Sequence, residues 1–237
     1  MTDILKLLRP HQWVKNIFVL APLLFNPDTL TGARALPVVL GTLLFCAIAS
    51  AVYVFNDFRD RTADRAHPDK KNRPLAAGQV GTQPAIAIMI GLAVIGLAGA
   101  WFVDQVFFVT LLVYVVINLG YSLWLKHVAI VDVLLVAAGF VLRIEAGGTL
   151  ADVPVTPWIV VCTGLLALFL ALAKRRDDLV RRVGNEHRRS LDGYNLPFLD
   201  AALTVVVAAT FITYVLYTLD ASVMARMGSD KLYFTTP

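Results

Sequence analysis

Long runs of hydrophobic residues, separated by short polar segments, extend along almost the whole 237-residue chain. A helix needs about 20 predominantly apolar residues to cross the hydrocarbon core of a bilayer, and most of the runs approach this length. The pattern therefore predicts membrane-spanning helices over residues 13–25, 35–55, 84–103, 106–125, 128–147, 154–173 and 197–219. We expect an all-α fold, a polytopic transmembrane helical bundle with seven spans, in a single integral membrane domain over residues 1–237.

The first of these runs is the least regular. It is short for a span and contains Pro22, and a proline inside a helix removes a backbone hydrogen bond and kinks or breaks the helix. We expect this segment to be tilted, broken or extended towards Leu30. Basic residues before it suggest a signal peptide, but no small-residue cleavage site follows and another hydrophobic run comes next, so we reject that interpretation.

The composition excludes a soluble globular enzyme and a disordered chain. Hydrophobic residues make up 58% of the sequence and charged residues 16%, against about 25% charged residues in soluble domains; the mean hydropathy is +0.70. Cys46 and Cys162 both lie in hydrophobic runs, so they indicate neither a disulfide framework nor a metal site. In a membrane protein, the net charge of +4 bears on the orientation of the chain in the bilayer rather than on nucleic-acid binding. We expect no nucleic-acid partner.

Basic residues are distributed unevenly between the two sides of the predicted bundle. The N-terminal segment and the even-numbered connections hold all of the 21 Lys and Arg residues except Arg34, Arg143, Arg226 and Lys231. Because basic residues accumulate on the cytoplasmic side of membrane proteins, we expect the N-terminus and these connections to be cytoplasmic. The sequence leaves open whether the chain forms a homo-oligomer.

The connection over residues 56–83 carries the strongest chemical signal. Asn56, Asp60 and Asp64 are spaced so that they share one face of a continuing helix, and Asp57 is adjacent. Oxygen ligands of this kind suit Mg²⁺, which takes one or two carboxylates together with phosphate oxygens of a substrate. The basic run that follows, including Lys70 and Arg73, can bind phosphate. The alternative is a solvated, salt-bridged cytoplasmic loop.

A second polar connection, over residues 174–196, begins with Lys174-Arg175 and Asp178. Taken alone, these charges are better explained as the end of a membrane span than as a binding site. Their position on the same side as the first connection, however, favours a second part of one metal–phosphate site. Tyr121 and Lys126 lie near the same end, where helix termination and snorkelling are the alternative.

Two further ionisable residues lie in the fifth predicted span. Arg143 and Glu145 are near its opposite end. Ionisable residues in spans are candidates for function, but we expect these two to pair near the outer interface.

The motif Asn56-Asp57-x-x-Asp60-x-x-x-Asp64, followed by Arg73-Pro74, resembles the first motif of the UbiA superfamily of intramembrane prenyltransferases. The resemblance in span pattern covers essentially the whole chain. It implies a bundle of nine helices with cytoplasmic motifs after the second and sixth. We therefore expect helices eight and nine to be missing and the C-terminus to be truncated.

Within the superfamily, the chain resembles the branch of phosphoribosyltransferases. The resemblance lies in residues 8–16 and 64–70, in Leu142-Arg143 with Gly147-Gly148, and in Lys174-Arg175-x-x-Asp178-Leu179, which replaces the usual DxxxD second motif. It implies Mg²⁺-dependent transfer of 5-phosphoribose from phosphoribosyl pyrophosphate (PRPP) to a polyprenyl (decaprenyl) phosphate, for cell-wall arabinan precursors, in a bacterial inner membrane.

The residues and the resemblance together define a candidate site. The predicted metal ligands are Asn56, Asp57, Asp60, Asp64 and Asp178. The predicted catalytic residues are Asp60, Asp64, Lys126 and Lys174. The predicted substrate-binding residues are Arg9, Lys15, Asn56, Lys70, Arg73, Tyr121 and Arg175.

Two other functions remain alternatives. A UbiA-type aromatic prenyltransferase with a polyprenyl diphosphate donor would also fit the first motif, but the second connection and the opening segment favour phosphoribose. A transporter of anionic solutes is more distant, because transporters commonly show internal repeats and midplane charges, and we find no internal repeat.

Overall fold

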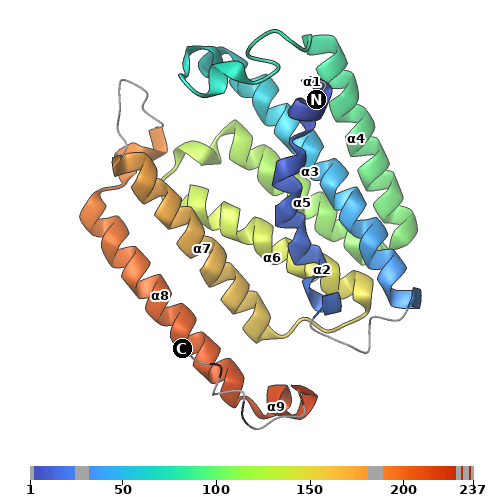
Figure 1. Ribbon diagram of the computed structural model, residues 1–237, viewed down its shortest axis with the longest axis vertical. Coiled ribbons are helices and arrows are strands. Elements are labelled where there is room, and N and C mark those ends of the chain that lie inside the picture. The colour runs from blue at the N-terminus through green and yellow to red at the C-terminus, as the bar shows by residue number, and fades with distance from the viewer. Residues whose placement is uncertain (1–2, 25–31, 181–188, 228–230, 232–234, 236–237) are drawn as a thin grey trace. The chain divides into compact units, whose positions relative to one another are not determined.

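The computed structural model describes residues 3–24, 32–180, 189–227, 231 and 235 of the chain. This part of the chain is predominantly helical and contains no strand (Figure 1). The long helices are α3 (Gly32–Ala66), α4 (Thr82–Val103), α5 (Gln105–Leu123), α6 (Val131–Ala151), α7 (Pro157–Val180) and α8 (Leu196–Leu219). The short helices are α1 (Asp3–Leu8), η1 (Pro10–Asn16), α2 (Ile17–Leu24), η3 (Lys70–Asn72), η4 (Leu125–His127), η5 (Arg189–Gly193) and α9 (Ala221–Met227). The predicted all-α fold is confirmed.

Six helices in the described residues are long and apolar enough to cross a membrane, namely α3 to α8. The prediction of seven spans is wrong in its first member, because the opening run forms the 3-10 helix η1 and the eight-residue helix α2, which contains Pro22. An α-helix of eight residues is only about 12 Å long. The irregularity expected at this segment is therefore present in its described part, and the extension expected towards Leu30 lies outside the described residues.

Both predicted cytoplasmic connections begin as helix rather than as loop. Helix α3 continues to Ala66 and α7 continues to Val180, beyond the hydrophobic runs that predicted them. The first motif therefore lies on the last turns of α3, and the Lys174-Arg175 motif lies on the last turns of α7. Regular helix geometry fixes the relative positions of the side chains within each motif.

The chain forms two compact units. Unit 1 consists of Met1–Leu125 and Leu142–Pro154, and unit 2 consists of Lys126–Val141 and Val155–Pro237. The division falls within α6, so each unit contains one part of that helix.

In unit 1, α4 packs closely beside α3, and the N-terminal elements lie along α3 (Figure 1). A Cβ added at Gly96 would come within 2.5 Å of Ile48 Cγ1, so the small residue allows the two helices to approach. A Cβ at Gly147 of α6 would lie 2.1 Å from the carbonyl oxygen of Val19 in α2. The core around these contacts contains Phe45, Phe107 and Leu111, all fully buried.

In unit 2, α7 and α8 lie side by side (Figure 1). Their buried contacts include Leu172 of α7 and Leu199 of α8. Asn195 caps the N-terminus of α8, where its Oδ1 accepts a hydrogen bond from the Phe198 backbone N–H at 2.8 Å. Pro197 occupies the first turn, where a missing backbone N–H is tolerated.

Candidate functional site

Two carboxylates near the end of α3 share one arginine. Asp57 and Asp64 are seven residues apart, which places them on the same side of the helix, and they are only 1% and 4% exposed. Arg73 Nη1 donates to Asp57 Oδ1 at 3.0 Å and to Asp64 Oδ2 at 2.7 Å. A residue predicted to bind phosphate therefore contacts two of the predicted metal ligands.

The segment after α3 folds back so that Arg73 reaches these carboxylates. His67 Nδ1 accepts hydrogen bonds from the backbone N–H groups of Asp69, at 3.1 Å, and Lys70, at 3.3 Å. These bonds close the turn after the helix. A buried apolar cluster anchors the segment and consists of Leu7, Val54, Leu75, Val80 and Ala85.

A second arginine approaches Asp57 from the N-terminal segment. Arg9 Nη2 donates to Asp57 Oδ1, the same oxygen that Arg73 contacts, and the Arg9 guanidinium carbon lies 5.5 Å from the ring centroid of Tyr53. The Arg9 backbone is left-handed, with φ 53° and ψ 58°, directly before Pro10. This conformation is strained for a non-glycine residue and persists only where its surroundings enforce it.

The segment after Arg9 is fixed along one face of α3. Trp13 Nε1 donates to Ser50 Oγ at 2.9 Å, and Asn16 Nδ2 donates to Cys46 Sγ at 3.0 Å. Positions 46 and 50, contacted by this segment, and position 57, contacted by Arg9, share one side of the helix. The segment that carried part of the family resemblance is therefore a strip docked on the helix of the first motif.

Arg143 is a buried anchor for the far end of this strip. Its Nε donates to Asn16 Oδ1 at 2.8 Å and its Nη2 donates to the Tyr114 hydroxyl at 3.1 Å. The guanidinium also lies 5.0 Å from the ring centroid of Phe45, a cation–π distance. We expected Arg143 to pair with Glu145, but residues two apart on a helix point to different sides. The contacts described here give Arg143 a packing role inside unit 1.

Two buried oxygens in the motif accept no hydrogen bond. They are Asn56 Oδ1 and Asp57 Oδ2, from adjacent residues of α3. Unpartnered buried oxygens are costly, and an amide and a carboxylate oxygen are ligands that Mg²⁺ accepts. Among the described residues, no three His, Cys, Asp or Glu side chains converge as a metal cluster. The residues present therefore fit a cation that takes few protein ligands and completes its shell with substrate phosphate and water.

The other predicted residues of unit 1 come from four elements, η1, α3, η3 and α5. Asp60 follows Asn56 by one helical turn and precedes Asp64 by another, so the predicted spacing on one helix is present. Lys15 of η1, Lys70 of η3 and Tyr121 of α5 are each partly exposed. Their roles in binding stay predictions.

Unit 2 contains a different polar cluster, centred on Asp132. Arg175 Nε donates to Asp132 Oδ2 at 2.7 Å, and Arg175 Nη1 donates to Asp178 Oδ2 at 3.0 Å. The Tyr194 hydroxyl donates to Asp132 Oδ1 at 2.7 Å. Arg175 is only 3% exposed and Asp132 is fully buried. Arg175, predicted to bind substrate, thus joins α6 to α7, and Asp178, predicted to bind metal, is its second partner.

The cluster also holds a strained turn before α6. The Ile130 backbone N–H donates to the Tyr194 hydroxyl at 2.7 Å, and Ile130 has φ 69°, an outlier for a β-branched residue. Burial and the Asp132 bond raise the pKa of Tyr194 to about 12, so its hydroxyl keeps its proton at neutral pH. We did not predict Tyr194, because its partner lies 62 residues away and nothing in the local spacing indicates the pair.

The remaining predicted residues of unit 2 are more accessible. Lys126 of η4 is partly exposed and Lys174 of α7 is exposed.

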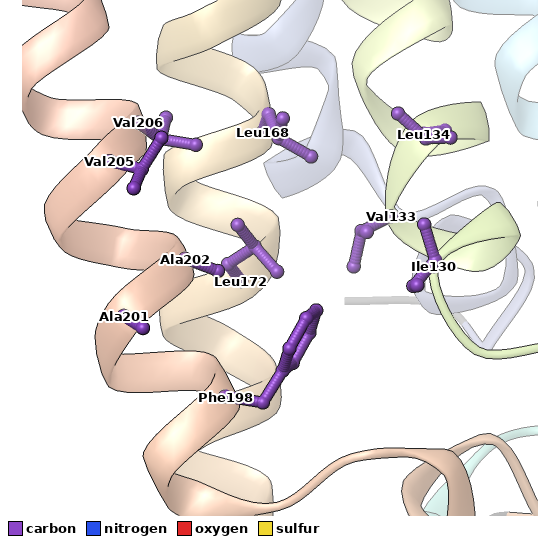
Figure 2. Close-up of a pocket in the computed structure, with 10 residues that line it drawn as sticks. All are labelled: Ile130, Val133, Leu134, Leu168, Leu172, Phe198, Ala201, Ala202, Val205 and Val206. Atoms are coloured by element: carbon purple, nitrogen blue, oxygen red, sulfur yellow. The ribbon is translucent and has the colours of Figure 1, made fainter.

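An apolar pocket of about 380 Å³ lies between the first turn of α6 and the helices α7 and α8, and Figure 2 shows that its side chains carry only carbon. The pocket is lined by Ile130, Val133, Leu134, Leu168, Leu172, Phe198, Ala201, Ala202, Val205 and Val206. With no polar side chain in its wall, it suits an apolar chain rather than a phosphate.

These features agree with a comparison against known families. A model described as the UbiA prenyltransferase family matches residues 17–234. The chain belongs to the UbiA prenyltransferase family. This UbiA protein is therefore a multi-pass membrane transferase, and the resemblance inferred from the first motif is confirmed.

Similar proteins of known name extend the comparison. The UbiA chain is 35% identical over 227 residues to the decaprenyl-phosphate phosphoribosyltransferase of Mycolicibacterium smegmatis, covering 92% of this chain and 70% of that protein. It is 34% identical over 229 residues to the protein of the same name from Mycobacterium tuberculosis, covering 93% of this chain and 75% of that protein. A UbiA homolog from Archaeoglobus fulgidus, solved bound to DMAPP and Mg²⁺, matches with a TM-score of 0.79 at 22% identity, over 100% of this chain and 84% of that one. The structural match shows a shared fold.

Proposed function

We propose that this UbiA protein transfers 5-phosphoribose from PRPP to a polyprenyl phosphate, such as decaprenyl phosphate, and releases pyrophosphate. The observation that carries the proposal is the 34–35% identity to proteins named decaprenyl-phosphate phosphoribosyltransferase over 92–93% of the chain. The Lys174-Arg175-x-x-Asp178 sequence in place of an Asp-rich second motif supports the same assignment. We place the enzyme in a bacterial inner membrane, with the N-terminus and both motifs cytoplasmic, as a source of cell-wall arabinan precursors.

The first motif has the chemistry to bind the diphosphate of such a donor. Arg9 and Arg73 bring two guanidinium groups to Asp57 and Asp64, and guanidinium binds phosphate oxygens through paired hydrogen bonds. Asn56 Oδ1 and Asp57 Oδ2 are the open oxygens that would hold Mg²⁺. Bound there, Mg²⁺ would supply positive charge against the leaving pyrophosphate.

The proposed reaction needs no strong general base. An anionic oxygen of the polyprenyl phosphate attacks C1 of the ribose, and the new C1–O bond forms as the C1–O bond to the diphosphate breaks. Pyrophosphate leaves with the electron pair of that bond. In this scheme the cationic side chains of unit 1 orient the donor and stabilise negative charge on the leaving group. Lys15 and Lys70 are the further phosphate ligands that we assign to unit 1.

The residues of unit 2 enter the proposal as separate assignments. Lys126 and Lys174 are proposed to bind anionic groups of the substrates, because both are accessible cations. Arg175 and Asp178 are proposed to act through the fold of unit 2, since they pair with each other.

The test is a transfer assay with purified protein in nanodiscs. The substrates are decaprenyl phosphate and PRPP labelled in the ribose, with Mg²⁺ in one series and EDTA in the other. The proposal predicts Mg²⁺-dependent movement of label into the lipid phase.

A second arm replaces PRPP with a labelled polyprenyl diphosphate and an aromatic acceptor. Consumption of this donor, with no transfer from PRPP, would reassign the protein to the aromatic prenyltransferases of the family. Label transfer that persists in EDTA would contradict the proposed metal dependence while leaving phosphoribose as the group transferred.

A further inference from the structure

The two buried carboxylates of the first motif are matched by two arginines without a metal ion. Asp57 and Asp64 contribute two negative charges, and Arg9 and Arg73, which contact them directly, contribute two positive charges. Both carboxylates are buried, and the Arg9 and Arg73 side chains are 16% and 26% exposed. The ion pairs therefore lie where solvent screens them weakly.

This balance is unfavourable for a divalent cation that arrives alone. A cation at the open oxygens Asn56 Oδ1 and Asp57 Oδ2 would meet carboxylates already neutralised by two guanidinium groups. A nearby like charge lowers the affinity of a site for a cation, by the same electrostatics that shift a pKa. A diphosphate that arrives with the cation removes the conflict, because the guanidinium groups can then bind phosphate oxygens.

The arginines are held in place by the fold. Arg9 has a strained left-handed backbone, and the strip that follows is fixed to α3 through Trp13 and Asn16. Arg73 is returned to the helix by the turn that His67 closes and by the apolar cluster around Leu75. The segments before and after α3 in sequence thus each place a guanidinium group at Asp57 Oδ1.

We propose that Arg9 and Arg73 are resident counter-ions of the motif, and that they make the binding of the divalent cation and of the diphosphate mutually dependent. Without diphosphate the arginines occupy Asp57 and Asp64, and the metal site is weak. When diphosphate binds, their hydrogen bonds pass to phosphate oxygens, and the carboxylates become available to the cation. The inference rests on the proposed metal–diphosphate site, but it does not depend on the ribose.

The test measures Mn²⁺ binding to the purified full chain by EPR titration of free Mn²⁺, with no substrate present. The variants are Arg73→Met and a matched control, Arg61→Met, which removes another guanidinium of α3 whose Nη1 bonds the Thr82 hydroxyl at 2.8 Å. We expect Arg73→Met to bind Mn²⁺ on the order of tenfold more tightly than wild type, the scale of a single nearby charge. Arg61→Met should match wild type.

A second titration adds inorganic pyrophosphate and is corrected for the Mn²⁺–pyrophosphate complex measured without protein. Pyrophosphate should tighten Mn²⁺ binding to wild type by a larger factor than to Arg73→Met. Arg9→Met provides an independent variant with the same expected direction, so that poor folding of Arg73→Met does not remove the test.

Suppose that the wild type binds Mn²⁺ in the presence of pyrophosphate, but that the Mn²⁺ affinity of both Arg73→Met and Arg9→Met is unchanged or weaker. This result would overturn the counter-ion role alone. Absence of any Mn²⁺ binding to wild type, even with pyrophosphate, would overturn the proposed metal site and this inference with it.

Discussion

The Asp132 cluster of unit 2 and the Asp57 cluster of unit 1 differ in how completely their side chains satisfy one another. In unit 2, Tyr194 and Arg175 each donate to a different oxygen of Asp132. In unit 1, Arg9 and Arg73 both donate to one oxygen of Asp57, while its other oxygen has no hydrogen-bond partner.

This difference distinguishes a polar network that stabilises the fold from one that can bind a ligand. A closed buried network rigidifies the fold and gains nothing from a ligand. A buried oxygen without a partner is a cost that a bound cation can remove. We therefore assign stability to the Asp132 cluster and ligand binding to the Asp57 cluster.

The largest expected effect is on the stability of unit 2. Asp132→Asn leaves Arg175 with a weaker partner in a buried position, and breaking a buried ion pair typically costs about 3–5 kcal/mol. Thermal and denaturant unfolding in detergent should show this loss. Unfolding indistinguishable from wild type would mean that the Asp132 cluster does not stabilise the fold.

The second prediction concerns activity through the first motif. Asp60→Asn should reduce transfer per folded molecule by about 100-fold, the scale for losing one electrostatic contribution to a transition state. The matched control is Asp69→Asn, an exposed aspartate after the motif helix, which should keep near wild-type activity. Equal losses in the two variants would remove the assignment of the metal-binding face.

A smaller effect is expected for Tyr194→Phe. The change removes the hydroxyl that joins Asp132 to the Ile130 backbone N–H, and loss of such buried bonds costs about 1–3 kcal/mol. Transfer per folded molecule should stay close to wild type. Tyr214→Phe, whose hydroxyl contacts Thr235 at 2.8 Å, is the control and should unfold as wild type does. A selective loss of activity in Tyr194→Phe would place the tyrosine in the reaction.

The smallest effect is expected at an exposed pair of unit 2. Arg176 Nε and Asp200 Oδ1 form an ion pair in which both side chains are about half exposed. Such pairs contribute about 0–1 kcal/mol, so Asp200→Asn should change the unfolding midpoint little in low or high salt. A loss as large as that of Asp132→Asn would show that burial does not distinguish the two pairs.

The features that the sequence predicted correctly are those set by local periodicity. The four-residue spacing of Asn56, Asp60 and Asp64 indicated one face of a helix, and α3 does continue through them. Pro22 indicated an irregular first segment, which is present.

The features that it did not predict depend on distant partners. Asp132, Arg175 and Tyr194 come from three segments, separated by 43 and 62 residues from Asp132, and no local pattern joins them. The approach of Arg9 to Asp57 depends on a left-handed residue before Pro10, a conformation that an Arg-Pro sequence does not suggest. Both arginines donate to Asp57 Oδ1, which leaves Asp57 Oδ2 without a hydrogen-bond partner. Only the structure shows this arrangement.

The most direct test of the division between the two clusters is one assay on three proteins: wild type, Asp57→Asn and Tyr194→Phe. Each is incubated in nanodiscs with labelled PRPP, decaprenyl phosphate and Mg²⁺, and label in the lipid phase is normalised to folded protein. We predict that Asp57→Asn abolishes transfer and that Tyr194→Phe retains it. Full transfer by Asp57→Asn, or equal loss in both variants, would contradict the assignment of the Asp57 cluster as the site that binds the donor.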